Sequence, residues 1–175
     1  MKLIHRVSFF IAMSIFSTLF ASADEGHSVK PYAAPKVEAL NQDGETVKLA
    51  SFYTEGFTLV YFYPKSGTPG CTAQACSLRD AYEDLTQAGV KVIGVSVDDT
   101  AAQKKFATKQ KLPFTLLADP EGKVLEAFGV KKIPLIGLAS RQAFLIKDGN
   151  VIWHDAKAST SEQAADVLKA VKAAS

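Results

Sequence analysis

Residues 57–76 read FTLVYFYPKSGTPGCTAQAC, and this stretch decides how the rest of the chain is interpreted. Its first part, 57–63, is an unbroken run of β-branched and aromatic residues, which is typical of a strand buried on both faces. The run ends at Pro64. From residue 68 to residue 88 the pattern becomes helical, because one stripe repeats at intervals of three or four residues. The members of this stripe are Cys71, Ala75, Leu78, Tyr82 and Leu85.

The segments on either side of this stretch alternate in the same way. Apolar runs predict two further strands, at 90–97 and 114–117. Helical patterns occupy 100–111, 121–128 and 161–173, and in the last of these we expect Ala165, Leu168 and Val171 to form the apolar face. Turn-rich sequences at 41–45 and 147–150 each separate two short apolar runs and predict β-hairpins. This order predicts an α/β fold with a central sheet flanked by helices.

The composition fits one soluble globular domain and limits the partners that the protein can have. The chain has 175 residues, of which 47% are hydrophobic and 22% charged. Without Lys2 and Arg6, which lie in the amino-terminal leader, 18 basic residues balance 18 acidic ones. No run of Lys and Arg exceeds two residues, which argues against nucleic acid or an anionic membrane as partner. We expect the partner to be a small molecule or another protein.

The first 23 residues have the pattern of an export signal. A basic start precedes an apolar stretch at 7–20, and Ala21-Ser22-Ala23 follows as a cleavage site. An uncleaved anchor is the alternative, but an apolar stretch of fourteen residues falls short of the about 20 residues that span a membrane. We therefore expect a mature protein that begins at Asp24, is periplasmic or secreted and has no membrane contact. Residues 24–35 are predicted to be a polar leader arm before a domain at 36–175, with structure beginning near Val37.

The two cysteines, Cys71 and Cys76, raise three possibilities. Two cysteines in an exported domain are typical of a structural disulfide. A zinc site needs about four ligands, and the only histidines after the leader, His27 and His154, are far from the cysteines in sequence, so we expect no metal. Helical residues five apart differ by about 140° in direction and about 7.5 Å in height. Because a disulfide tolerates Cα separations of only roughly 4.4–6.8 Å, this bond requires local unwinding, which favours redox cycling.

The predicted position of Cys71 makes it a candidate nucleophile. Thr68 fits an N-cap, Pro69 the first helical position and Cys71 the third. There the thiol would lie among unpaired backbone N–H groups at the positive end of the helix dipole, where a thiolate is favoured. The alternative is a capped helix with an inert buried cysteine.

The same residues carry a resemblance to a known family. Pro64, Thr68 and Cys71 fill the three fixed positions of Pro-x-x-x-Thr/Ser-x-x-Cys, the active-site pattern of the peroxiredoxins. The continuation AQACSLRD at 73–80 is similar to the bacterioferritin comigratory protein branch, also called peroxiredoxin Q. The likeness extends over about residues 35–173. Gln74 departs from the branch, in which Glu is common at this position, and Gln103 stands where His often does.

This resemblance implies a thioredoxin-like fold with an amino-terminal β-hairpin extension and the activity of a thiol-dependent peroxidase. It assigns Cys71 as the peroxidatic residue and Cys76 as the resolving one, joined by an intramolecular disulfide. Thr68, Gly70 and Arg141 would bind the peroxide, although Arg141 alone would be interpreted as a solvated cation, and Pro64 would shield the thiolate. The implied partners are hydrogen peroxide or an organic hydroperoxide and a thioredoxin-like reductant. No cofactor is implied, and a monomer is expected.

Two other functions remain open from the residues alone. The first is a thiol–disulfide oxidoreductase of the same fold that acts on protein disulfides, although the chain lacks a Cys-x-x-Cys motif. The second is a redox-responsive binding or holdase module that exposes apolar surface when the helix unwinds.

Overall fold

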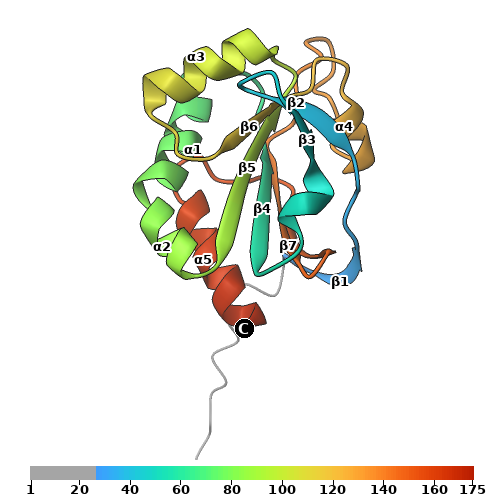
Figure 1. The fold of residues 1–175 in the computed structure, drawn as a ribbon, viewed down its shortest axis with the longest axis vertical. Helices are drawn as coiled ribbons and strands as arrows, with labels where there is room; N and C mark the ends of the chain where they lie inside the picture. Colours follow the sequence, from blue (N-terminus) through green and yellow to red (C-terminus); the bar gives the residue numbers. More distant parts are fainter. Residues whose placement is uncertain (1–26) are drawn as a thin grey trace, which may run out of the picture.

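The computed structural model describes residues 27–175. Eight strands form one mixed sheet in the order β1-β8-β7-β4-β5-β6-β2-β3, and helices cover both of its faces (Figure 1). The strands are β1 (Ser28–Ala33), β2 (Glu38–Asn41), β3 (Thr46–Lys48), β4 (Phe57–Phe62), β5 (Val90–Ser96), β6 (Thr115–Ala118), β7 (Gln142–Lys147) and β8 (Asn150–Asp155). The helices are η1 (Leu49–Phe52), α1 (Pro69–Asp80), α2 (Tyr82–Gln87), α3 (Thr100–Gln110), α4 (Lys123–Ala127) and α5 (Gln163–Ala174). The predicted α/β fold with a flanked central sheet is confirmed.

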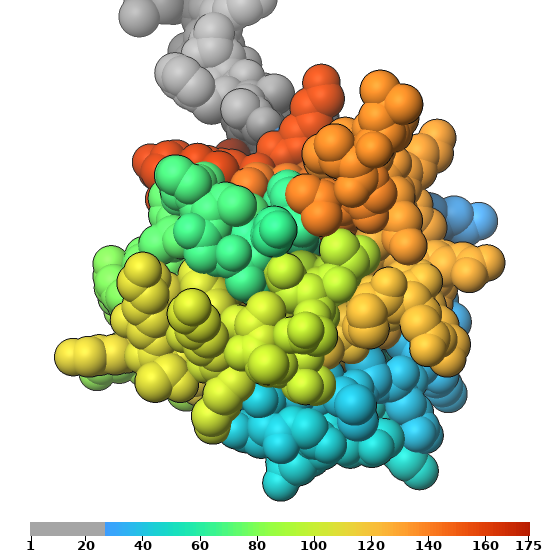
Figure 2. Space-filling model, turned by 90° about the horizontal axis from the view of Figure 1, so that it is seen from above, coloured from blue at the N-terminus to red at the C-terminus, as the bar shows by residue number. Residues whose placement is uncertain are grey.

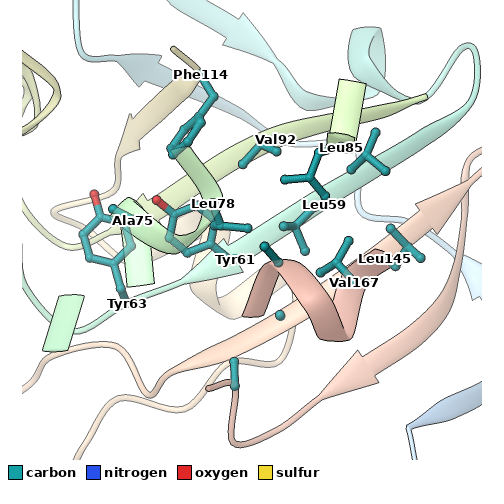
Figure 3. Close-up of a cluster of buried hydrophobic side chains, with 14 of the residues drawn as sticks. Leu59, Tyr61, Tyr63, Ala75, Leu78, Leu85, Val92, Phe114, Leu145 and Val167 are labelled. Atoms are coloured by element: carbon teal, nitrogen blue, oxygen red, sulfur yellow. The ribbon is translucent and has the colours of Figure 1, made fainter. Parts of the chain in front are cut away.

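Strand β4 lies at the centre of the sheet, and all six of its residues are buried. It pairs in parallel with β5 and antiparallel with β7. Leu59 and Tyr61 point into the core beneath α1, α2 and α5, whereas Val60 and Phe62 point into a second core beneath α4 (Figure 3 shows the first core). The prediction of a strand buried on both faces is therefore confirmed.

The helix predicted over 68–88 consists of two helices, α1 and α2, separated at Ala81. The backbone there has φ −98° and ψ 14°, and the Ala81 amide bonds to the carbonyls of Ser77 and Arg79. No glycine or proline marks the break, so periodicity alone could not locate it. The stripe itself is confirmed, because Cys71, Ala75, Leu78 and Leu85 are buried and Tyr82 packs against them.

The apolar face predicted for the last helix is confirmed at Val171, which is buried, and at Leu168, which packs against the core, but it is wrong at Ala165. Ala165 is exposed, whereas Ala164, Val167, Ala170 and Val171 are buried. Helix α5 has alanine on both faces, so several stripes fit its sequence about equally well, and the contact with α1 and the sheet selects one of them.

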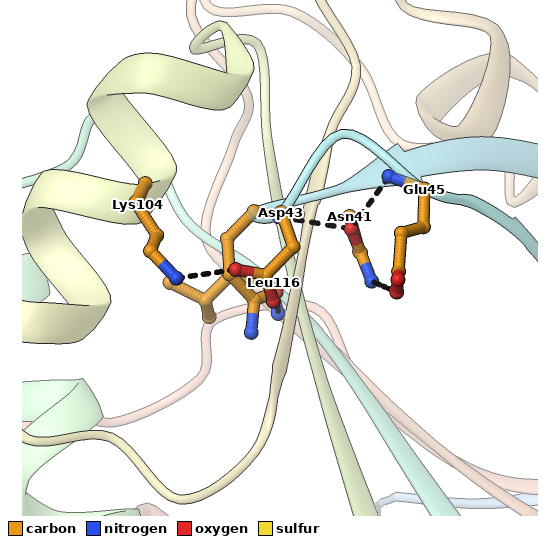
Figure 4. Close-up of polar contacts among 6 residues, drawn as sticks. Asn41, Asp43, Glu45, Lys104 and Leu116 are labelled. Carbon is orange, nitrogen blue, oxygen red and sulfur yellow. Dashed lines mark hydrogen bonds and ion pairs between the residues drawn. The ribbon is translucent and has the colours of Figure 1, made fainter.

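Both predicted hairpins are confirmed, and each joins the sheet. In the first, Asn41 Oδ1 accepts the backbone N–H groups of Asp43 and Glu45, both at 2.9 Å, which holds the turn between β2 and β3 (Figure 4). Lys104 of α3 forms an ion pair with Asp43, so this turn is also tied to α3 (Figure 4). In the second hairpin the turn between β7 and β8 uses left-handed backbone at residues 148 and 149.

The expectation that structure begins near Val37 is wrong. Residues 28–33 form β1, which pairs antiparallel with β8 at the edge of the sheet, with Ser28 opposite Trp153. Most side chains of β1 are exposed, so the sequence lacks the apolar pattern by which a buried strand is recognised. The predicted export signal at 1–23 lies outside the described residues. Within 27–175 no helix is long and apolar enough to cross a membrane.

Candidate active site

Cys71 lies where the sequence predicts, in the first turn of α1. The helix begins at Pro69, and the backbone of Thr68 is extended, as an N-cap requires. The Cys71 side chain is only 1% exposed, so its thiol is shielded from bulk water. The first-turn amides of Gly70 and Cys71 have no carbonyl partner within the helix, so this end of α1 favours negative charge.

The side chain of Thr68 does not cap the helix. Its hydroxyl donates instead to the Lys65 carbonyl at 3.0 Å, which closes the loop that precedes α1. A hydroxyl that donates one bond keeps its acceptor lone pairs, so Thr68 remains able to accept a hydrogen bond from a ligand beside Cys71. Pro64 is half-buried at the start of this loop, directly after β4 and Tyr63.

Arg141 is brought to Cys71 from a distant part of the chain. It precedes β7, and its Nη2 lies 3.4 Å from Cys71 Sγ. The side chain is half-buried, so the interpretation as a solvated cation is wrong. None of the ion pairs within residues 27–175 involves Arg141. Its positive charge is therefore available to a thiolate at Cys71.

Two glutamines that the sequence analysis did not assign to the site hold Arg141 in place. Arg141 Nη1 donates to Gln74 Oε1, and Gln74 Nε2 donates to Gln163 Oε1. Both glutamine side chains are buried. Gln74 lies one helical turn after Cys71, a spacing that could have indicated it. Gln163 is the first residue of α5 and is remote in sequence, so no local signal marks it.

Gly70 leaves room for the guanidinium. A Cβ atom at this position would lie 3.4 Å from Arg141 Nη2 and 3.6 Å from Thr160 Cγ2. The first distance is at the lower limit of ordinary van der Waals contact, so a side chain larger than that of alanine at position 70 would compete with the guanidinium for this space. The predicted site residues Thr68, Gly70, Cys71 and Arg141 are therefore neighbours in the structure.

Cys76 lies on the same helix as Cys71 but has different neighbours. Cys71 contacts Arg141, whereas Cys76 Sγ is 3.8 Å from Gln110 Oε1, at the end of α3. Both cysteines are free thiols, and α1 is continuous through both positions. The structure thus presents the form with an intact helix, and the predicted disulfide is not tested by it.

The floor of the site contains a buried phenol. The Tyr61 hydroxyl is fully buried and has no hydrogen-bond partner within the described part of the chain. Burial raises the pKa of Tyr61 well above its ordinary value, Tyr63 and Cys71 act in the same direction, and Arg141 opposes them. Tyr61 therefore stays neutral and adds no charge beside Cys71.

The site lies at the end of the sheet where β4 ends and β7 begins, between the loop that leads to α1 and Arg141. Figure 2 looks onto this end, where the green residues around the start of α1 border the yellow-green residues that lead into α3. Among residues 27–175 no three His, Cys, Asp or Glu side chains are grouped in a way that could hold a metal ion. The groups that the structure brings together at this end are the thiol of Cys71, the guanidinium of Arg141 and the first-turn amides of α1.

Comparison with known proteins agrees with this geometry. Residues 32–154 match the AhpC/TSA family. The chain is 38% identical over 154 residues to peroxiredoxin Q, chloroplastic, of Populus jackii; this match covers 87% of this chain and 70% of the relative. It is 52% identical over 97 residues to peroxiredoxin Bcp of Escherichia coli (strain K12); this match covers 55% of this chain and 62% of the relative.

Among solved structures, peroxidoxin BcpB from Mycobacterium tuberculosis superposes with a TM-score of 0.77 at 30% identity. The match covers 84% of this chain and 98% of that one, so the predicted thioredoxin-like fold is confirmed. The predicted resemblance to the peroxiredoxin Q and Bcp branch is confirmed as well. By its sequence, its fold and the surroundings of Cys71, this chain belongs to the AhpC/TSA family, among the relatives named peroxiredoxin Q and Bcp.

Proposed function

We propose that this chain is a thiol-dependent peroxidase that reduces hydrogen peroxide and organic hydroperoxides, with Cys71 as the peroxidatic residue. The contact that carries the proposal is the 3.4 Å approach of Arg141 Nη2 to Cys71 Sγ at the start of α1. A thiolate at this place is stabilised by a guanidinium and by first-turn amides, and a stabilised thiolate is a nucleophile at neutral pH. The names of the relatives support the same activity.

The first reaction step is an attack by the Cys71 thiolate on one oxygen of the peroxide. The S–O bond forms as the O–O bond breaks, and the leaving oxygen takes the bonding pair and a proton to become water or an alcohol. The sulfur is oxidised to a sulfenic acid, and the peroxide is reduced. Negative charge develops on the leaving oxygen, where Arg141 and the amides of Gly70 and Cys71 can stabilise it, as in an oxyanion hole.

The neighbouring residues orient the peroxide for this attack. The Thr68 oxygen can accept a hydrogen bond from the O–H group of the peroxide, which turns the other oxygen toward the sulfur. Gly70 keeps space for the guanidinium, because a Cβ atom added at this position would lie 3.4 Å from Arg141 Nη2. Pro64, half-buried at the start of the loop that precedes Cys71, limits the access of water to the thiol.

Cys76 resolves the sulfenic acid in this proposal. Its thiol attacks the oxidised sulfur of Cys71, an S–S bond forms, and the hydroxyl leaves as water. Because Cys76 faces Gln110 on α3 while Cys71 faces Arg141, the bond requires α1 to unwind locally. A thioredoxin-like dithiol protein then reduces the disulfide by thiol–disulfide exchange and is itself oxidised.

Stopped-flow kinetics with the reduced protein and hydrogen peroxide test the function. We expect oxidation of the wild type orders of magnitude faster than that of an ordinary thiol at the same pH, and no turnover in Cys71→Ser. A wild type that reacts no faster than a free thiol, but reduces or oxidises protein disulfides, would establish the oxidoreductase function instead.

The disulfide has its own test. Non-reducing peptide mapping of the oxidised protein should recover a peptide pair joined through Cys71 and Cys76. Amide hydrogen exchange should rise between these residues, because the turn that holds them has opened. Recovery of disulfide-linked dimers alone would contradict the resolving role of Cys76.

We also propose that the protein is exported, on the pattern of residues 1–23. The plant relatives are named as chloroplastic, so targeted proteins occur among the relatives of this chain. Mass spectrometry of the protein from its native host should place the amino terminus at Asp24. A chain that begins at Met1 and is recovered from the cytoplasm would refute the proposal.

A functional monomer follows from resolution within one chain, because no residue of a second subunit is needed for it. Light scattering coupled to gel filtration should give the mass of one chain for both the reduced and the oxidised protein. A stable dimer whose dissociation abolishes turnover would contradict this part of the proposal.

A further inference from the structure

A fully buried amide on α3 contacts the loop that leads to Cys71. Gln103 Oε1 accepts hydrogen bonds from the hydroxyls of Tyr63 and Ser66. Gln103 Nε2 donates to Ser96 Oγ at 3.0 Å and to the Leu117 carbonyl at 2.7 Å. Two accepted and two donated bonds use the whole hydrogen-bonding capacity of the amide. The side chain is therefore fixed in one orientation.

Asp98 extends this contact to the backbone of the loop. Its Oδ2 accepts the backbone N–H of Ser66 at 2.7 Å and the hydroxyl of Ser96 at 2.7 Å. Ser66 is thus held at its main chain by Asp98 and at its side chain by Gln103. Charge-assisted bonds such as those to Asp98 are the stronger kind, so the loop has a firm anchor on this side.

The anchored loop carries the residues that surround the peroxide. Pro64 lies between the two anchored residues, Tyr63 and Ser66, and Thr68 follows two positions later. The Thr68 hydroxyl and amide both bond to the Lys65 carbonyl, so Thr68 moves with the loop. A displacement of Ser66 would therefore move the Thr68 hydroxyl relative to Cys71.

We infer that Gln103 is a positioning residue for the peroxide site, acting through Tyr63 and Ser66 on the loop at 63–68. The inference rests on the proposed peroxidase function. Within residues 27–175, none of the hydrogen bonds made by the side chains of Gln103 and Asp98 involves a residue of α1; their partners lie on the loop, β5 and β6. The loop can therefore keep its place while α1 opens to form the disulfide and closes again after reduction.

The test compares Gln103→Leu, which keeps the size of the side chain but removes its hydrogen bonds, with Val124→Ala as the matched control. Val124 is buried in the second core, beneath α4, so its truncation destabilises the fold without touching the loop. We expect the peroxide rate constant of Gln103→Leu to fall about 10- to 100-fold, the scale of a small misplacement of reacting groups. The rate of Cys71 alkylation by iodoacetamide should change by less than about threefold, because a small alkylating agent needs no oriented peroxide site.

Stability and exchange separate positioning from a structural role. The control should lose stability while it keeps its peroxide rate, and amide exchange at 66–68 should rise in Gln103→Leu but not in the control. If Gln103→Leu does not fold, Ser66→Ala removes one hydroxyl contact and should lower the peroxide rate without changing alkylation.

A Gln103→Leu or Ser66→Ala variant whose peroxide rate falls no more than that of the control would overturn the inference. A fall in peroxide and alkylation rates by the same factor would overturn it as well. Failure of the proposed function is a different result, because the wild type itself would then react slowly with peroxide. In that case unchanged exchange at 66–68 in Gln103→Leu would still refute the positioning role.

Discussion

Replacing Arg141 by Met removes the guanidinium that contacts Cys71 while keeping most of the side chain's length. The lost contact is a charge-assisted hydrogen bond from Nη2 to Sγ at 3.4 Å, in a half-buried place. Hydrogen bonds to charged groups contribute about 1.5–3 kcal/mol. If this hydrogen bond stabilises the transition state and not the ground state, its loss raises the activation free energy by the same amount. Because about 1.4 kcal/mol corresponds to a factor of ten in rate, the peroxide rate constant should fall about 10- to 150-fold.

The measurement is stopped-flow oxidation of the reduced protein over a range of hydrogen peroxide concentrations. The rate constant of Arg141→Lys should lie between those of the wild type and Arg141→Met. An ammonium group keeps the charge, but it lacks the planar guanidinium that contacts Cys71 and Gln74 at the same time. Lys147→Met is the matched control. Lys147 lies at the far end of β7, where its Nζ donates to the Ala174 carbonyl, so its loss should leave the rate unchanged.

A rate constant for Arg141→Met within threefold of the wild type would refute the assignment of Arg141 to the peroxide site. Equal losses of rate in Arg141→Met and Lys147→Met would refute the assignment too. They would show that the rate depends on the positive charge in this region and not on the contact between Arg141 and Cys71.

Two further predictions concern the resolving cysteine and the core beneath the site. Cys76→Ser should react with one equivalent of peroxide and then stop as a sulfenic acid that is prone to overoxidation, which mass spectrometry measures; full turnover with a dithiol reductant would contradict the role of Cys76. Gly94→Ala should lower the free energy of unfolding by about 1–3 kcal/mol, measured by urea denaturation. The added Cβ would lie 2.7 Å from Leu116 Cδ2 and 2.8 Å from the Tyr61 ring. An unchanged midpoint of the urea transition would contradict this prediction and would show that Tyr61 relaxes.

The features that the sequence predicts correctly are those specified by local patterns. β4 is recognised from an apolar run, the start of α1 from Thr68-Pro69, and both hairpins from their turn residues. These signals depend on residues within a few positions of one another. The pairing of Arg141 with Cys71 was expected only from the family resemblance, because no local pattern links a residue before β7 to the start of α1.

The features that the sequence does not predict depend on contacts between distant segments. Gln74, Gln103 and Gln163 are polar residues in helices, where the usual expectation is exposure, and each is buried because it meets partners from another element. The face of α5 is ambiguous in an alanine-rich sequence and is fixed only by packing. The strand β1 is hidden by its polar side chains, because its stability comes from backbone pairing with β8.

That pairing sets the order in which the sheet can be completed. Among residues 27–175, β1 is the first strand, but it lies at the edge of the sheet, where its neighbour is β8, more than a hundred residues later. A ribosome releases the amino-terminal end first, so β1 has no partner until nearly the whole polypeptide has been synthesised. Pairing of β1 with β8 closes the longest loop between paired strands of this sheet, so it has the largest loop-closure entropy cost among these pairings. Strand β1 therefore stays unpaired through most of synthesis and joins the sheet only when the carboxyl-terminal hairpin has formed.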